Sequence, residues 1–228
     1  MKTLGIIGGL GPETTAEFYS YISYHPKVTK QLKRPHILIS SVPIYKKHEQ
    51  AGVNGKAPKD LKNLLINEAQ RLEQAGAELI VMPCNSLHVF ENDLKNTVPD
   101  KFISIIDATT EFIKQQNIKY IGVLSTALTA KNKLYENALQ NIGINVISVP
   151  PYMQVKLNKT VLNLINNSAN IKDIKTLNTA LDFLYNNRAQ AILLGCTDLQ
   201  LIAPRKYKIP IFDTMKILGD KVVEEMVG

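Results

Sequence analysis

The sequence has no tryptophan and only two cysteines, Cys84 and Cys196, among 228 residues. Two cysteines are too few for a structural metal site, so we expect no metal ion. They also stand 112 positions apart in a chain without a recognisable export signal, which makes a disulfide a poor candidate. The two thiols are therefore either buried core residues or catalytic groups.

The sequence also lacks the segments that export a protein or anchor it in a membrane. Its longest apolar runs, such as residues 191–194, are far shorter than the roughly 20 residues needed to cross a bilayer. The first residues, MKTLGIIGG, contain neither a charged leader nor an apolar stretch long enough for export. We expect a cytoplasmic protein with no membrane partner.

Positive charge is in excess but is not concentrated anywhere. The net charge is +7, yet the lysines are spread thinly along the chain rather than gathered in a block. There is no zinc-finger spacing and no alternation of aromatic and basic residues typical of an RNA-binding platform. The charge therefore indicates a solvated basic surface, and we expect no nucleic-acid partner.

What is present is an alternation of strand-like and helical segments, with 45% apolar residues to form a core. Strand-like TLGIIGG and HILISSV enclose a helical segment, PETTAEFYSYIS; a long polar loop follows, then a helix over residues 60–77 and the strand ELIVMPC. This order predicts an α/β protein with a mostly parallel sheet flanked by helices. Ligands of such sheets bind at the carboxyl ends of the strands.

Three segments of the first half recur in the same order in the second half. KTLGIIGGLGPETTAEFY is similar to KYIGVLSTALTAKNKLYE, AGAELIVMPCNS to NRAQAILLGCTD, and FISIIDATTEFI to IPIFDTMKILGD. The repeat predicts two closely packed, pseudo-symmetric lobes with the active site in the cleft between them. We assign residues 1–100, completed by 210–228, to the N-terminal lobe and residues 101–209 to the C-terminal lobe.

Each cysteine stands where a strand ends and a helix is expected to begin. Residue types that cap helices follow both thiols, and a helix N-terminus would lower a thiol pKa. Two thiols on opposite faces of a substrate could remove a proton from a carbon and return one from the other side, which is two-base racemisation. Hydroxyls and amides at the strand ends would stabilise the charge that develops on a carboxylate, unless they are plain helix caps. The candidates for this role are Asn85, Ser86, Ser125, Thr126 and Thr197.

Three motifs resemble those of the aspartate/glutamate racemase family: GIIGGLGPETT, MPCNSLH and LLGCTD. The resemblance covers nearly the full chain and implies an amino-acid racemase, with aspartate or glutamate as first expectation and a broader range as second. It further implies a homodimer and no cofactor, pyridoxal phosphate included. By the same resemblance Cys84 serves the D enantiomer and Cys196 the L enantiomer. Contacts with the substrate carboxylate carry over to Asn85, Ser86 and Thr197, and the family's contact from the glycine turn carries over to Leu10.

The sequence departs from this family in the residues expected to bind the substrate side chain. Aspartate-specific members carry an arginine in the loop after the second strand, and here His48 stands in its place within PIYKKHEQ. A basic residue expected in the second lobe is displaced to Lys156. We take His48 and Lys156 as candidate substrate-binding residues. Asp198 stands where glutamate or histidine is commoner, which shortens the reach of any group that assists Cys196.

The segment GGLGPETT after the first strand does not match a dinucleotide-binding fingerprint, because Thr14 occupies the place of the third glycine. It suits a small anion, such as a substrate carboxylate, at the start of a helix. His88 lies about one helical turn beyond Cys84 and either tunes the thiol or caps and packs. Asp107 and Asp213 fall at matched places and are expected to cap helices.

Two alternatives remain open beside the racemase. One is a related isomerase or racemase of another carbon acid, of the hydantoin or maleate type. The other is a non-catalytic protein that binds amino acids in the same cleft.

Overall fold

The computed structural model describes residues 1–228 and contains two parallel four-stranded sheets. The first sheet has the order β2-β1-β3-β4 and the second the order β6-β5-β7-β8. The strands of the first sheet are β1 (Leu4–Gly8), β2 (Ile37–Ser41), β3 (Leu79–Val81) and β4 (Phe102–Ile103). Those of the second sheet are β5 (Tyr120–Ser125), β6 (Asn145–Ser148), β7 (Ala191–Gly195) and β8 (Ile211–Asp213). The identical strand orders confirm the predicted α/β fold with two matched lobes.

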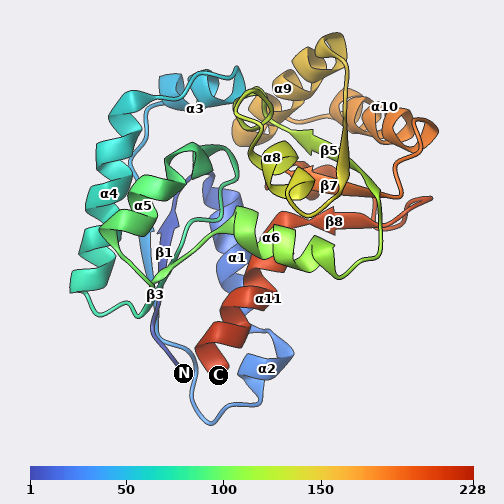
Figure 1. The fold of residues 1–228 in the computed structure, drawn as a ribbon. Helices are drawn as coiled ribbons and strands as arrows, with labels where there is room; N and C mark the ends of the chain where they lie inside the picture. Colours follow the sequence, from blue (N-terminus) through green and yellow to red (C-terminus); the bar gives the residue numbers. More distant parts are fainter.

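Helices flank both sheets (Figure 1). Around the first sheet lie α1 (Pro12–Ser23), α2 (Pro26–Thr29), α3 (Lys46–Val53), α4 (Lys59–Gln74), the 3₁₀ helix η1 (Ser86–Phe90) and α5 (Glu91–Thr97). The second half carries α7 (Ala127–Lys131), α8 (Leu134–Gln140), α9 (Pro151–Ile165), α10 (Ile171–Asn186) and the 3₁₀ helix η2 (Leu199–Ile202). The last strand of each sheet leads into α6 (Ile105–Lys114) and α11 (Thr214–Val227).

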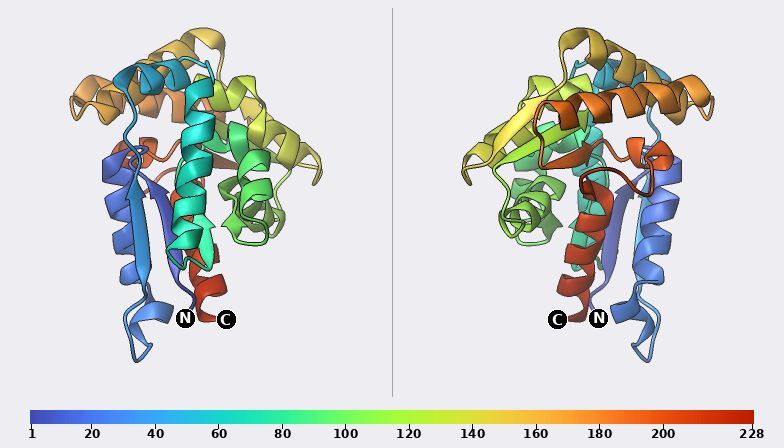
Figure 2. Two further views of the ribbon diagram at one scale, coloured as in Figure 1. Left: turned by 90° about the vertical axis from the view of Figure 1, so that its left-hand side faces the viewer. Right: turned by 90° about the vertical axis from the view of Figure 1, so that its right-hand side faces the viewer.

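Helix α11 returns the end of the chain to the first lobe. It packs against α6 and α1, and Lys2 N donates a hydrogen bond to Met226 O over 3.0 Å. Figure 2 shows the two termini side by side at one end of the molecule. One cluster of 23 buried apolar residues takes members from both sheets and from α6 and α11, so the lobes share a core. The assignment of 1–100 with 210–228 to one lobe and 101–209 to the other stays a prediction.

The strand registers show which residues of the two halves are counterparts. Ile80 pairs with Phe102 in the first sheet, and Ile192 pairs with Ile211 in the second. Phe102 and Ile211 are therefore counterparts. The residue two positions after Phe102 is Ser104 and the residue two positions after Ile211 is Asp213, so the counterpart of Asp213 is Ser104 and not Asp107. Both are helix N-caps: Ser104 Oγ accepts from the amides of residues 106 and 107, and Asp213 Oδ1 accepts from that of residue 215. The predicted capping role of Asp213 is confirmed, whereas that of Asp107 is wrong.

The region predicted as a long polar loop contains a helix, α3. Its sequence, KKHEQAGV, shows no apolar periodicity because only Gly52 and Val53 of the helix are buried. The helix is held by tertiary contacts instead, with η1 in the first half and with α7 and α9 in the second. Helix α3 therefore spans both lobes.

No helix of the structure is both long and apolar enough to cross a membrane.

Candidate active site

Both cysteines line one cavity at the carboxyl ends of β3 and β7, the matched central strands of the two sheets. The cavity volume is about 60 Å³. Eight of the ten predicted site residues line it: Leu10, His48, Cys84, Asn85, Ser86, Thr126, Cys196 and Thr197. The topology brings them together because parallel strands end at the same edge of a sheet and the two edges face each other.

Ser125 and Lys156 are the two predicted site residues that the structure does not bring to the cavity. Ser125 is buried behind the lining, where its hydroxyl donates to Thr126 O over 3.2 Å. Lys156 is exposed on α9, because the helix buries the face that carries Met153, Leu157 and Val161. Lys156 lies at the edge of that face, three residues after Met153 and four before the buried Thr160.

The helix starts predicted after the cysteines are 3₁₀ helices, η1 and η2, rather than α-helices. Their N-cap residues, Asn85 and Asp198, make no capping hydrogen bond with their side chains. The alternative that these two side chains are plain helix caps therefore does not hold. Both side chains are instead engaged in contacts across the molecule.

Asn85 belongs to a buried hydrogen-bond network that joins the lobes. Tyr135 OH donates to Asn85 Oδ1, and Asn85 Nδ2 donates to Thr214 Oγ1 over 3.0 Å. The Thr214 hydroxyl in turn donates to Leu194 O, one residue before the end of β7, over 2.9 Å. Tyr135 is fully buried, and burial raises its pKa, so its phenol stays protonated as a donor. The network fixes the backbone on either side of the cavity.

Two hydroxyls meet across the lobes in the cavity lining. Ser86 Oγ of η1 lies 2.7 Å from Thr126 Oγ1, the N-cap of α7. Thr197, which follows Cys196, directs its hydroxyl to Pro83 O over 3.5 Å. Three hydroxyls beside two thiols form a set of donors suited to a small carboxylate.

The prediction of lowered thiol pKa values is wrong. Burial raises the pKa of Cys84 to about 12, and it raises that of Cys196 well above its usual value, assisted by the negative charge of Asp198. Amide groups at the starts of η1 and η2 act in the predicted direction, toward a lower pKa, but they are outweighed by desolvation. Both thiols are therefore protonated until a positive charge enters or a base accepts a proton.

Asp198 is such a base, and it was not among the predicted site residues. It lines the cavity and is 7% exposed. The Cys196 thiol donates to Asp198 Oδ2 over 3.5 Å, and Thr14 Oγ1 donates to Oδ1 over 3.4 Å. Burial raises the pKa of Asp198 to about 6, so the carboxylate is ionised at neutral pH yet able to take a proton. Its position directly after LLGCT in the sequence was the signal that could have identified it.

His88 has a structural role, which decides between the two alternatives left open by the sequence. Its Nε2 accepts a hydrogen bond from Ile105 N over 3.1 Å, so its proton lies on Nδ1, 2.8 Å from Cys84 O. Burial lowers the pKa of His88, and the ring is neutral. His88 thus ties the backbone of Cys84 to the start of α6.

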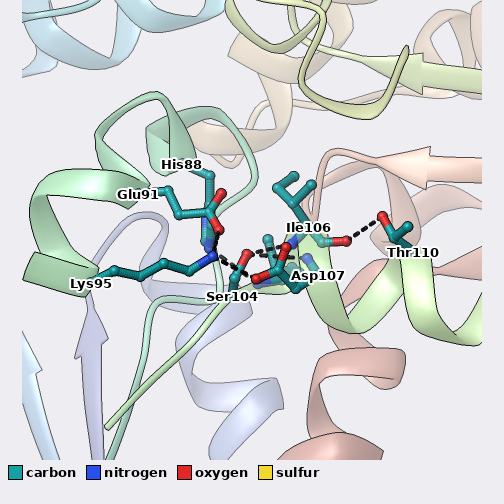
Figure 3. Close-up of polar contacts among 8 residues, drawn as sticks. His88, Glu91, Lys95, Ser104, Ile106, Asp107 and Thr110 are labelled. Atoms are coloured by element: carbon teal, nitrogen blue, oxygen red, sulfur yellow. Dashed lines mark hydrogen bonds and ion pairs between the residues drawn. The ribbon is translucent and has the colours of Figure 1, made fainter. Parts of the chain in front are cut away.

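Charged groups lie beside this link (Figure 3). Lys95 pairs with Glu91 over 2.5 Å and with Asp107 over 2.6 Å. Asp107 is exposed and serves this ion pair rather than a helix cap. The cluster joins α5 to α6 beside the link made by His88.

The glycine turn after β1 brings the backbone of Leu10 and Gly11 to the cavity. Gly9 has a φ of +79°, and a Cβ there would lie 2.8 Å from Val42 N, so only glycine fits. Thr15 Oγ1 accepts from Gly9 N and donates to Gly11 O, both over 2.9 Å. The turn is therefore held at both ends before α1 begins.

Sequence reasoning missed eight residues of the lining besides those discussed above. They are Glu49, Gly52 and Val53 of α3, Val161 and Ile165 of α9, Ile44 before α3, Leu61 of α4 and Leu87 of η1. The residues of α3 were missed because that segment was predicted as loop. No group of three or more His, Cys, Asp or Glu side chains in residues 1–228 is arranged to hold a metal ion.

The Asp/Glu/Hydantoin racemase family model matches residues 7–221. The chain belongs to this family. A relative from Bacillus subtilis, named a broad-specificity amino-acid racemase, RacX, is 26% identical over 228 aligned residues that cover 96% of each chain. Membership in this racemase family places the protein among the isomerases, as the sequence predicts.

Two solved structures show the same two-lobed fold. An aspartate racemase homologue from Pyrococcus horikoshii has 26% sequence identity and a TM-score of 0.79, with full coverage of both chains. A glutamate racemase from Francisella tularensis in complex with D-glutamate has 15% identity and a TM-score of 0.72, covering 98% of this chain and 80% of that chain. The family's racemase fold therefore extends over the whole chain.

Proposed function

We propose that the protein is an amino-acid racemase that inverts the α-carbon by proton transfer between Cys84 and Cys196. The observation that carries the proposal is that both thiols line one cavity, at the ends of matched strands in two facing sheets. The name of the Bacillus subtilis relative and the D-glutamate bound to the Francisella tularensis protein support an amino-acid substrate.

In the proposed reaction one cysteine begins as thiolate and the other as thiol. The thiolate takes the α-proton of the substrate and becomes a thiol, which leaves a carbanion whose charge moves onto the carboxylate. The second thiol then donates its proton to the opposite face of the carbon and becomes the thiolate. Cys196 acts on the L enantiomer and Cys84 on the D enantiomer, so the roles exchange with direction.

Asp198 supports the proposed role of Cys196 through its carboxylate. The Cys196 thiol already donates to Oδ2, and a carboxyl with a pKa of about 6 can accept that proton near neutral pH. The amide groups of Asp198 and Leu199 then stabilise the thiolate. Cys84 has the amides of Ser86 and Leu87 for the same purpose, and the substrate ammonium group lowers both thiol pKa values further.

The substrate carboxylate is assigned to the polar side of the cavity. The hydroxyls of Ser86, Thr126 and Thr197 and the backbone at Leu10 supply donors, and Asn85 holds the backbone between them in place. These donors stabilise the developing enolate charge more strongly than the ground state. The thiols perform both proton transfers, so the proposed reaction needs no pyridoxal phosphate, and the expected homodimer stays a prediction.

Exchange of the α-proton in deuterated water tests this function. Purified protein is incubated with single L-amino acids, the products are separated by chiral chromatography, and their masses are measured by mass spectrometry. We expect a product of opposite hand that carries one deuterium at the α-carbon. A panel of all amino acids with neither exchange nor inversion would leave a binding protein as the explanation of the cavity.

A further inference from the structure

Part of the cavity lining takes no part in the proposed proton transfer. Its wall is aliphatic, formed by Ile44, Val53, Leu61, Val161 and Ile165, and it includes the carboxylate of Glu49. No lysine or arginine lines the cavity. Lys46 and Lys47, which precede His48 and Glu49 in α3, are exposed, and Lys62, which follows Leu61, pairs with Asp93.

Negative charge prevails around this space. Glu49 is half-buried in the first turn of α3, and burial raises its pKa, with the charge of Glu13 acting in the same direction and that of Lys46 opposing. A Cβ on Gly11 would lie 3.5 Å from Asp198 Oδ1 and 3.6 Å from Glu13 Oε2, so two more carboxylates flank the glycine turn. A substrate with a second carboxylate would meet these charges in a cavity whose lining holds no lysine or arginine to offset them.

His48 supplies an independent observation that favours a hydrogen-bond donor on the substrate. Its side chain is 11% exposed and lines the cavity, and its Nδ1 is buried without a hydrogen-bond partner. Nε2 lies 3.8 Å from Asp60 Oδ2. Nε2 is thus the ring atom that faces this carboxylate, and Nδ1 is left as the atom without a partner, which a donor on the substrate would satisfy. A buried acceptor of this kind is costly to leave unpaired.

We propose that the substrate carries a cationic side chain, whose methylene stem lies along the aliphatic wall and whose charged end pairs with Glu49 and donates to His48 Nδ1. This assignment rests on the proposed racemase function. An ammonium or guanidinium group on an aliphatic stem meets all three features at once. A purely apolar side chain would instead strip the remaining water from Glu49 and leave its carboxylate unpaired.

A matched pair of substrates tests the assignment. L-Lysine and L-norleucine have stems of the same length and differ in the terminal ammonium group. We expect kcat/KM for L-lysine to exceed that for L-norleucine, L-aspartate and L-glutamate by about tenfold or more. We expect Glu49→Gln to lower kcat/KM for L-lysine by about tenfold and that for L-norleucine by less than about twofold.

The control variant is Glu111→Gln, which removes a carboxylate that pairs with Lys221 outside the cavity. This variant should have the same kcat/KM as the wild type for L-lysine and for L-norleucine. Faster turnover of aspartate, glutamate or norleucine than of lysine would overturn the cationic assignment while the racemase function stands. An equal loss of kcat/KM for lysine and norleucine in Glu49→Gln would also overturn it, since the effect of Glu49 would then come from the stability of the fold and not from the charge of the substrate. If no amino acid exchanges its α-proton, the racemase function fails and the assignment fails with it.

Discussion

An Asp198→Asn substitution removes a carboxylate that is 7% exposed and that hydrogen-bonds the Cys196 thiol. Burial raises the pKa of Asp198 from 3.8 to about 6. Each unit of pKa difference between the folded and the unfolded state changes the free energy of unfolding by about 1.4 kcal/mol. The ionised carboxylate therefore destabilises the folded protein by about 3 kcal/mol. The penalty is absent below about pH 4, grows between about pH 4 and pH 6, and is complete above that range, because the folded protein holds the proton more tightly than the unfolded chain.

The neutral asparagine carries no such penalty, so Asp198→Asn should unfold less readily at high pH. We expect a gain of up to about 3 kcal/mol in the free energy of unfolding at pH 8 and almost none at pH 4. Urea titrations of both proteins at the two pH values measure it. A gain that is the same at both pH values, or a loss at pH 8, would refute the reasoning about the buried charge.

The same substitution should cost activity. Without a carboxylate to take the Cys196 proton, kcat/KM should fall by about 100-fold, and the decline of the wild-type rate below about pH 6 should disappear. The two enantiomers have equal free energies, so the equilibrium constant is 1 and kcat/KM must fall by the same factor for the L and the D enantiomer. Asp182→Asn, on a carboxylate bound to Tyr207 and Lys208 outside the cavity, serves as the control with unchanged activity. Persistence of the acid limb in Asp198→Asn would show that another group accepts the proton.

The remaining predictions concern the thiols and the two links that hold them. Cys84→Ala and Cys196→Ala should each abolish racemisation. In deuterated water Cys84→Ala should still exchange the α-proton of the L enantiomer, and Cys196→Ala that of the D enantiomer. Full racemisation by either variant would contradict two-base transfer. His88→Ala should lower the free energy of unfolding by about 2 to 4 kcal/mol, because it leaves a buried amide of α6 and a carbonyl unpaired, and a chemical denaturation curve like that of the wild type would argue against this link. Tyr135→Phe should cost about 1 to 3 kcal/mol by leaving Asn85 Oδ1 without its donor, measurable in the same assay, and a neutral effect would mean that the network holds without the phenol.

The sequence predicts the parts of this site that follow directly from strand ends. Cys84 and Cys196 could be found because each stands at the end of an apolar run, and parallel topology brings such ends to one edge. The internal repeat predicts the second sheet in the same way. Residues adjacent to a strand end in sequence are adjacent in space, which is why Asn85, Ser86 and Thr197 were also found.

The rest depends on tertiary contacts that no local pattern encodes. Helix α3 buries only Gly52 and Val53, so its sequence shows no helical periodicity, and Glu49 was missed with it. The thiol pKa values depend on depth below the surface, and the sequence shows the amide groups that lower them but not the burial that raises them more. Lys156 was chosen by its place beside Val155, and it lies at the edge of the buried face of α9, where the spacing of apolar residues does not decide between cavity and solvent.

The matched strand orders of the two sheets relate the lobes by something close to a rotation, whereas the two enantiomers of a substrate are related by reflection. A chain of L-residues can repeat itself by rotation but cannot build its own mirror image. Two lobes with identical surroundings at both thiols would therefore not present mirror-image environments to the two hands of a substrate. Ser86 and Asp198 stand at the same position after their cysteines and differ, and the proposed assignment of one enantiomer to each thiol requires a difference of this kind. Repetition provides a second thiol, and only divergence between the copies lets each thiol meet its own enantiomer.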